Sequence, residues 1–189
     1  MACTFFSHAV PEVVECHGER FRLFLDAATI QRRVAELGQE ISRDYAGKRP
    51  ILIGVLNGAF VFLADLIRAI TIDCEVDFLK LSSYGAEKVS SGQVYELKKI
   101  DADIRNRHVL VVEDIVDTGL SMQFMLERLK AHEPASLATV ALLHKAEATR
   151  VEVPLDYVGF RIPNQFVIGY GLDYGQLARN FSSIYVLEN

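Results

Sequence analysis

Apolar residues recur every three or four positions between residues 26 and 45, which is the spacing of one face of an α-helix. The positions on that face are Ile30, Val34, Leu37, Ile41 and Tyr45. Asp26 belongs to the residue types that cap helix N-termini, and Gly47 and Pro50 are residues that end helices. The pattern therefore predicts a helix that begins after Asp26 and runs to about residue 45.

Short runs of almost uninterrupted apolar residues follow this helix and alternate with further helical patterns. Such runs are typical of parallel strands that are covered on both faces. We expect these strands at residues 51–56, 75–81, 108–112 and 136–143. Helices are expected between them, at about residues 60–70 and 120–132. This alternation predicts an α/β fold in which helices flank a parallel twisted sheet.

The patterns near the two ends of the chain are weaker. The first twenty residues predict no regular structure, and a short edge strand is expected at about residues 21–25. Residues 82–93 are polar and include two glycines, which predicts a long, mobile loop, and such loops are usually either functional or disordered. Further short strands are expected at about residues 94–98, 157–161, 166–170 and 183–187.

The most informative segment is residues 109–121, Val-Leu-Val-Val-Glu-Asp-Ile-Val-Asp-Thr-Gly-Leu-Ser. An apolar strand leads into the carboxylates Glu113 and Asp114, and a glycine-containing turn then opens a helix. Backbone N–H groups at such a helix N-terminus bind anions. The carboxylates themselves need a cation, a sugar hydroxyl or a proton. Together these features predict a site for a phosphorylated sugar, with Mg²⁺ as the cation.

Each part of this segment has other interpretations. Glu113 and Asp114 alone are typical of a solvated strand end, and Thr118-Gly119 alone is typical of an ordinary turn. Asp-Thr-Gly is also the signature of aspartic proteases, but their fold is rich in β-structure, whereas a helical pattern follows here. Receiver-type phosphoacceptor sites have an acidic pair after a strand but do not need Thr-Gly-x-Ser. A phosphoribosyl-diphosphate loop fits every position from 109 to 121.

In this segment the chain resembles the type I phosphoribosyltransferases, and three further segments resemble the hypoxanthine-guanine members of that family. These segments are residues 81–85, Leu143-His144-Lys145, and a C-terminal segment made of residues 160–163 and 166–174. The resemblance implies that one domain spans residues 1–189. Its parallel sheet would form a core at about residues 26–150, and residues 1–25 and 151–189 would form a small hood.

The resemblance also implies an activity, that of a Mg²⁺-dependent purine-salvage transferase. Such an enzyme moves the 5-phosphoribosyl group of phosphoribosyl diphosphate to N9 of hypoxanthine or guanine, which gives IMP or GMP and pyrophosphate. The preference among hypoxanthine, guanine and xanthine stays open. The alternatives are a regulator of the same fold that senses phosphoribosyl diphosphate and binds RNA or DNA, and a pyrimidine or adenine transferase.

Roles for the residues of the 113–121 segment follow from the resemblance. Glu113 and Asp114 would hold the ribose hydroxyls, in part through Mg²⁺. Asp117 would be the general base near the purine N7. The backbone N–H groups and hydroxyls at the start of the next helix would bind the 5′-phosphate, and the residues that supply them are Thr118, Gly119, Leu120 and Ser121. Some relatives carry a lysine at the position of Leu120.

The resemblance assigns the purine and the pyrophosphate to other segments. Lys145 would donate to the purine O6 and so disfavour adenine. The rest of the purine site would be Phe166, which stacks on the base, together with Val167 and Leu172. Asp173 would bind a Mg²⁺ ion that is shared with pyrophosphate. The pyrophosphate contacts would be Asn57, Gly58, Ser83, Tyr84 and Arg179, and a strained or cis peptide bond is expected before Asn57.

The composition of the chain argues against several kinds of partner and location. The formal net charge is −5 and no basic stripe is present, which argues against nucleic acid as a partner. No apolar stretch reaches the roughly 20 residues that span a bilayer. The three cysteines have no metal-binding or disulfide spacing, which favours a reducing compartment. We expect a cytoplasmic enzyme without membrane partners, and the family implies a homodimer or homotetramer.

Overall fold

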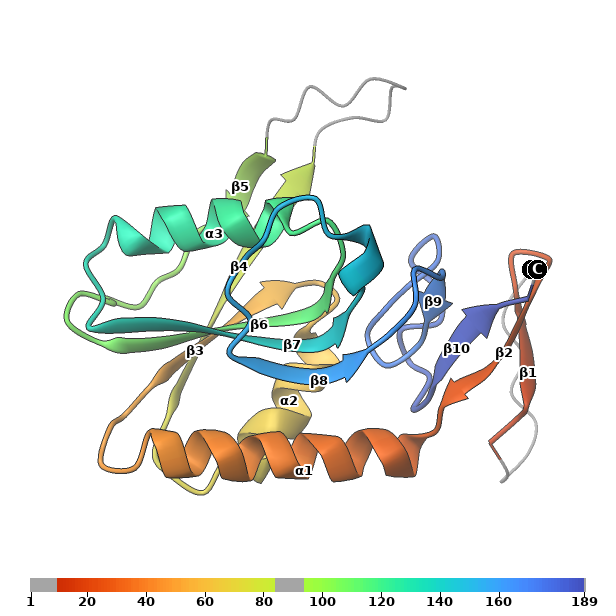
Figure 1. The fold of residues 1–189 in the computed structure, drawn as a ribbon, viewed down its shortest axis with the longest axis horizontal. Helices are drawn as coiled ribbons and strands as arrows, with labels where there is room; N and C mark the ends of the chain where they lie inside the picture. Colours follow the sequence, from red (N-terminus) through yellow and green to blue (C-terminus); the bar gives the residue numbers. More distant parts are fainter. Residues whose placement is uncertain (1–9, 84–93, 189) are drawn as a thin grey trace.

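The structure is a computed structural model that describes residues 10–83 and 94–188 of the chain. Two sheets lie side by side in the molecule (Figure 1). The larger sheet has six strands in the order β5-β4-β3-β6-β7-β8, and helices flank it. The smaller sheet has four strands in the order β1-β2-β10-β9. The predicted α/β fold with a parallel sheet between helices is thereby confirmed.

Five of the six strands of the larger sheet run parallel to their neighbours, and only β5 is antiparallel. The strands are β3 (Ile51–Leu56), β4 (Glu75–Ser83), β5 (Val94–Lys98), β6 (His108–Val116), β7 (Ser136–His144) and β8 (Tyr157–Arg161). The helices are α1 (Ala27–Asp44), α2 (Phe60–Ala69) and α3 (Leu120–Lys130), with a short 3-10 turn η1 (Ala146–Ala148) after β7.

The helices cover the sheet unequally, with α1 and α2 on one face and α3 on the other (Figure 1). Alternate strand residues therefore face two separate apolar cores. Leu110 and Val112 of β6 belong to the core under α1 and α2, whereas Val109 and Val111 belong to the core under α3. Burial on both faces explains why these strands read as continuous apolar runs in the sequence.

The first helix forms where its apolar spacing predicts it. The side chain of Asp26 caps α1, because its Oδ1 accepts a hydrogen bond of 2.7 Å from the backbone N–H of Thr29. Tyr45 is the C-cap residue. Four of the five predicted positions, Ile30, Val34, Leu37 and Ile41, are at most 1% exposed.

The small sheet was only partly predicted. It consists of β1 (Val13–Cys16), β2 (Glu19–Leu25), β9 (Val167–Ile168) and β10 (Ile184–Leu187). The expectation that the first twenty residues are irregular was wrong for β1, which pairs with β2 in antiparallel register. The strand expected at about residues 21–25 does form as part of β2. It is not an edge strand, because β2 lies between β1 and β10 in the sheet. The strand expected at 166–170 is shorter, since the chain turns sharply after Ile168.

A second correction concerns β6. The sequence predicted that this strand ends before the carboxylates, but the strand continues through Glu113 and Asp114 to Val116. The reason is its neighbour β7, because Ile115 pairs with Leu143 and Val116 with His144 along the extended strand. The carboxylates therefore lie inside a strand, where the sheet holds their positions.

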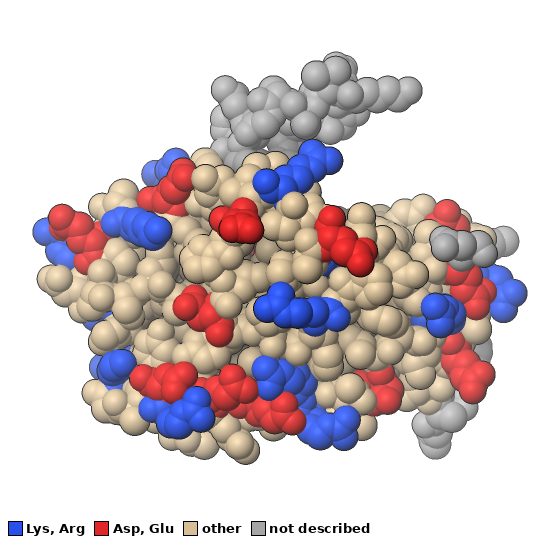
Figure 2. Space-filling model, viewed as in Figure 1, with Lys and Arg blue, Asp and Glu red and all other residues tan. Residues whose placement is uncertain are grey.

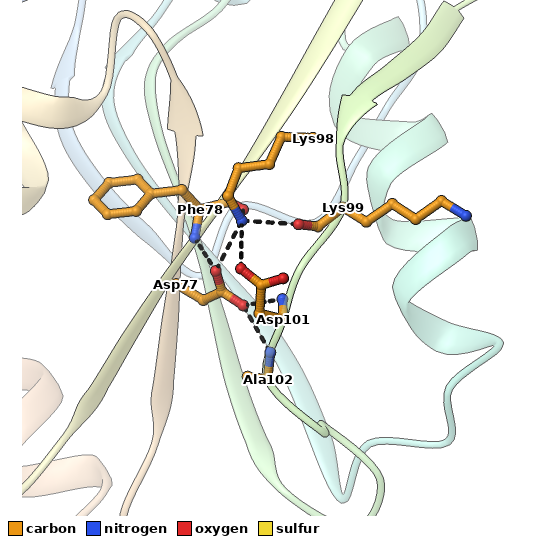
Figure 3. A network of polar contacts seen from close by, with 6 residues as sticks. All are labelled: Asp77, Phe78, Lys98, Lys99, Asp101 and Ala102. Carbon is orange, nitrogen blue, oxygen red and sulfur yellow. Dashed lines mark hydrogen bonds and ion pairs between the residues drawn. The ribbon is translucent and has the colours of Figure 1, made fainter.

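A buried carboxylate on β4 binds the chain segment that follows β5 (Figure 3). Asp77 of β4 is 8% exposed and accepts hydrogen bonds from the backbone N–H groups of Asp101 and Ala102 at 2.6 and 2.8 Å. The ammonium group of Lys98 lies 3.3 Å from the same carboxylate. Within the described residues, no helix is long and apolar enough to cross a membrane.

Candidate active site

Three chain segments meet at the carboxyl ends of the adjacent strands β3, β6 and β7. Gly58 follows β3, Asp117 follows β6 and Lys145 follows β7. A Cβ atom at Gly58 would overlap the carboxylate of Asp114, so a glycine is needed for this close approach. Ligands of parallel α/β sheets bind at this edge. The structure therefore places the three sequence motifs around one site.

Glu113 and Asp114 form a buried acid pair near the end of β6. Burial, followed by the charge of Asp114, raises the pKa of Glu113 well above its usual value. Burial also raises the pKa of Asp114, although the N–H of Ile115 and the charge of Arg179 act in the other direction. Glu113 Oε2 is shielded from solvent and has no hydrogen-bond partner among the described residues.

This acid pair fits a bound Mg²⁺ ion. Among the described residues, no three Asp, Glu, His or Cys side chains gather as a complete metal cage. Mg²⁺ rarely needs such a cage, because it usually binds one or two carboxylates together with water and substrate phosphates. The unpartnered Glu113 oxygen and the raised pKa values are what a cation at this position would relieve.

The predicted phosphate loop surrounds a small cavity of about 100 Å³. Its polar lining comes from Glu113, Asp117, Thr118 and Ser121. Gly119 lies in this loop with a φ of 83°, which favours glycine, and a Cβ atom at this position would overlap the carbonyl oxygen of Val151. Together these residues form a turn that packs closely against the chain beyond β7.

The N-terminus of α3 opens onto this loop. The N-cap residue of α3 is Gly119, which has no side chain to cap the helix. Thr118 Oγ1 lies 3.5 Å from the N–H of Leu120, at the limit of a hydrogen bond. Leu120 is 48% exposed, and because its side chain has no polar group, it can offer an anion only its backbone N–H.

A larger cavity of about 280 Å³ adjoins the acid pair. Its polar groups come from Asp114, Asp117, Lys145 and Asp173, and its apolar lining from Ile115, Phe166, Val167 and Leu172. Lys145 is 7% exposed, and its Nζ lies 3.3 Å from Oδ2 of Asp117. Apolar walls with a few convergent polar groups are typical of a small-molecule site.

Phe166, the aromatic residue of this cavity, packs against a second ring, which packs against a third. Phe166 is 42% exposed, and its ring meets that of Tyr174 edge-on with 5.3 Å between the centroids. Tyr174 contacts His17 in the same manner at 4.8 Å, and His17 lies at the turn between β1 and β2. An exposed flat ring with such support is suited to stack on a planar base.

Arg179 and Asp173 form an ion pair at the site. Arg179 Nη2 lies 2.6 Å from Oδ1 of Asp173, and its Nη1 donates to the carbonyl oxygen of Gly171 at 2.7 Å. The peptide bond before Asn57 is cis, as the resemblance implied. Ser83 ends β4, but its side chain and all of Tyr84 lie outside the described residues.

Gly171 is a site residue that the sequence did not single out. Its φ is 98°, and a Cβ there would overlap the carbonyl oxygen of Gly58. The backbone of Gly58 is thus held between Asp114 on one side and Gly171 on the other. The pair of glycines around Tyr170 was a usable signal, because glycines with one residue between them often mark a sharp turn.

Comparison with known proteins agrees with this geometry. A family model described as the phosphoribosyl transferase domain matches residues 24–175. The hypoxanthine-guanine phosphoribosyltransferase of Aquifex aeolicus is 42% identical over 176 residues, which cover 93% of this chain and 99% of that protein. The enzyme of the same name from Mycobacterium tuberculosis is 44% identical over 177 residues, with 90% and 88% covered.

A solved structure is similar as well. The hypoxanthine-guanine phosphoribosyltransferase of Bacillus anthracis, which has a HEPES molecule in its active site, superposes with a TM-score of 0.84. The two sequences are 40% identical, and the match covers 88% of this chain and 98% of that one. Sequence and structure therefore point to the same group of proteins.

Proposed function

The chain belongs to the phosphoribosyl transferase family, and from that premise we propose that it transfers a 5-phosphoribosyl group to N9 of hypoxanthine or guanine. The donor is phosphoribosyl diphosphate, and the second product is pyrophosphate. The observation that carries the proposal is the cavity that Lys145 and Asp117 share with Phe166, directly beside the phosphate loop. A purine in this cavity lies next to a phosphorylated ribose at the acid pair.

Lys145 and Asp117 would read and activate the purine. The ammonium group of Lys145 donates to an oxygen at C6 and meets an amino group at that position unfavourably, which selects 6-oxopurines over adenine. The carboxylate of Asp117 would accept the proton from N7 while N9 attacks C1′ of the ribose. Phe166 would stack on the base, and Val167 and Leu172 would line its edge.

Glu113 and Asp114 would hold the ribose. Their carboxylates accept hydrogen bonds from the 2′- and 3′-hydroxyls, and their negative charge stabilises the positive charge that develops on the sugar as the bond to diphosphate breaks. A bound Mg²⁺ supplies neutralisation of the acid pair and of the diphosphate. The backbone N–H groups of residues 118–121, at the N-terminus of α3, would bind the 5′-phosphate.

The leaving pyrophosphate would lie on the side of Gly58 and Arg179. The backbone N–H groups of Asn57 and Gly58 would donate to it, and the guanidinium group of Arg179 would pair with its oxygens. Asp173, which pairs with Arg179, would hold a Mg²⁺ ion on this side. Ser83 and Tyr84 remain predicted contacts of the same ligand.

We extend the proposal to the organisation of the protein. The larger sheet would be the core that binds the phosphorylated sugar, and the small sheet would be the hood that covers the base. A homodimer or homotetramer and a cytoplasmic location remain predictions. A regulator of the same fold is less well supported, because Lys and Arg are interspersed with Asp and Glu on the face that Figure 2 shows.

A Mg²⁺-dependent assay of nucleotide formation tests the proposal. The full chain is incubated with phosphoribosyl diphosphate and, in turn, with hypoxanthine, guanine, xanthine or adenine. Turnover of hypoxanthine or guanine but not of adenine is expected. Tight binding of phosphoribosyl diphosphate without turnover of any base would instead favour the regulator.

A further inference from the structure

Tyr170 is a buried side chain beside the site for which the proposed mechanism has no role. It is 2% exposed, and its hydroxyl donates a hydrogen bond of 2.6 Å to Oδ2 of Asp65. Asp65 lies in α2, the helix that begins just after Gly58. The bond therefore joins the chain after β9 to the helix that follows the proposed pyrophosphate contact.

The backbone around Tyr170 has an uncommon conformation. Gly169, Tyr170 and Gly171 have φ angles of 100°, 52° and 98°, so three successive residues are in the left-handed region. Residues with a side chain rarely adopt this region, and a tyrosine does so only when its surroundings hold it there. Both flanking positions require glycine, because a Cβ would overlap the carbonyl oxygen of Ser183 or of Gly58.

This turn places several groups of the site. Gly171 packs directly on the backbone of Gly58. The carbonyl oxygen of Gly171 accepts from Arg179 at 2.7 Å, and Arg179 in turn pairs with Asp173. A movement of the turn would therefore shift the pyrophosphate side of the site.

Asp65 is a well-fixed acceptor for the tyrosine. Gln31 of α1 donates to the same oxygen at 2.6 Å, and Arg68 pairs with the other oxygen. Burial opposes ionisation of Asp65, but the hydrogen bonds from Tyr170, Gln31 and Arg68 outweigh it and lower the pKa of this carboxyl. Burial and the Asp65 carboxylate raise the pKa of Tyr170, which keeps its proton for this charge-assisted bond.

We propose that Tyr170 and Asp65 are a positioning pair that holds the 169–173 turn against Gly58 and thereby sets the affinity for phosphoribosyl diphosphate. Neither residue touches the substrate in this proposal. Tyr170 acts through Gly171, which packs on Gly58 and accepts from Arg179, and these two residues are proposed contacts of the diphosphate. The inference rests on the proposed function, since it assigns the diphosphate to this side of the site.

The test compares two tyrosines in the protein of residues 1–189. Tyr170→Phe removes only the hydroxyl, and Tyr157→Phe is the matched control. Tyr157 is 8% exposed, and its hydroxyl donates to Asp44 at 2.9 Å between β8 and the end of α1. Both variants lose one Tyr–Asp hydrogen bond and should lose similar thermal stability, but only Tyr170 belongs to the 169–173 turn.

The expected result is a split between the kinetic constants. For Tyr170→Phe, the KM for phosphoribosyl diphosphate should rise about tenfold, which is the usual scale for loss of a hydrogen bond to a charged group. Its kcat and its KM for hypoxanthine should change by less than about threefold. Tyr157→Phe should keep the wild-type kinetic constants.

Changes at Asp65 separate the hydrogen bond from the charge. Asp65→Asn keeps an oxygen that can accept from Tyr170. Its KM for phosphoribosyl diphosphate should therefore stay close to that of the wild type. Asp65→Ala should behave like Tyr170→Phe, and the double variant should be no worse than either single change, because both remove the same interaction.

Equal KM values for Tyr170→Phe and Tyr157→Phe would overturn the pair, while wild-type turnover in the same assay would leave the proposed function standing. A change confined to the KM for hypoxanthine would overturn it as well. If the wild type fails to turn over any base, the proposed function fails, and the pair is judged by calorimetric binding of phosphoribosyl diphosphate. About tenfold weaker binding by Tyr170→Phe alone would then support it, and equal binding would overturn it.

Discussion

The ammonium nitrogen of Lys145 lies 3.3 Å from a carboxylate oxygen of Asp117, although 28 positions separate the two residues in the sequence. They meet because β6 and β7 are adjacent parallel strands, and each residue directly follows the end of its strand. O6 and N7 are neighbours on one edge of a 6-oxopurine. A single ion pair at this sheet edge can therefore present a donor to one atom and a base to the other.

Replacement of Asp117 by asparagine should remove the base and leave the rest of the site in place. Asparagine has nearly the same shape but cannot accept the purine proton, so kcat should fall about 10²- to 10⁴-fold, as is usual for a general base. The affinity for phosphoribosyl diphosphate should stay close to that of the wild type, because the loop binds phosphate through its backbone. Steady-state kinetics and a direct binding measurement give the two values, and normal turnover would remove Asp117 from the mechanism.

Replacement of Lys145 by glutamine should weaken the choice between oxo and amino groups at C6. A charged donor is lost, so kcat/KM for hypoxanthine should fall about 10- to 100-fold. The glutamine amide can turn either its N–H group or its oxygen toward the base, so the ratio of hypoxanthine to adenine turnover should shrink. The measurement is kcat/KM for both bases with wild type and variant. An unchanged ratio would show that Lys145 does not read C6.

The buried carboxylate of Asp77 should be a strong determinant of stability. Asp77→Ala would leave the N–H groups of Asp101 and Ala102 without their acceptor, so the free energy of unfolding should fall by about 3 kcal/mol. Lys98→Met is the control, and it should lose less because the Lys98 side chain is 38% exposed. Urea unfolding of both variants gives the comparison, and an equal loss would mean that the ion pair, not the backbone hydrogen bonds, stabilises this region.

Elements with a strong local signal could be predicted from the sequence. The cap at Asp26 and the apolar face of α1 are encoded within one segment, and so is the apolar run of β3. By contrast, β1 is only four residues long, and its Val13 is 37% exposed. Its strand conformation depends on pairing with β2, which no periodicity in residues 13–16 reveals.

The site shows the same division. Motifs such as Asp117-Thr118-Gly119 carry their chemistry in consecutive residues, so their place at a strand end could be predicted. The extension of β6 past Asp114 depends on its pairing with β7, which is a long-range effect. Contacts such as Tyr170 with Asp65 join segments 105 residues apart, and the sequence holds no local trace of them.

The acid pair should make the unliganded protein less stable as the pH rises. Burial and the neighbouring Asp114 raise the pKa of Glu113 in the folded state above its ordinary value of 4.5. Between the unfolded and the folded pKa the folded protein binds more protons, so stability is fully present below about pH 4.5 and is lost as the pH rises through the folded pKa.

Glu113→Gln should remove this loss. Without Mg²⁺ or substrate, the variant should have a higher Tm than the wild type at pH 7.5, by about 2–4 °C for each kcal/mol in a chain of this size. The difference should shrink toward pH 5, where the wild-type carboxyl is increasingly protonated. The same variant should bind phosphoribosyl diphosphate less tightly, because it lacks the charge that holds the cation and the ribose. Thermal unfolding across this pH range decides the question, and a lower Tm of the variant at pH 7.5 would show that the Glu113 carboxylate stabilises the fold instead.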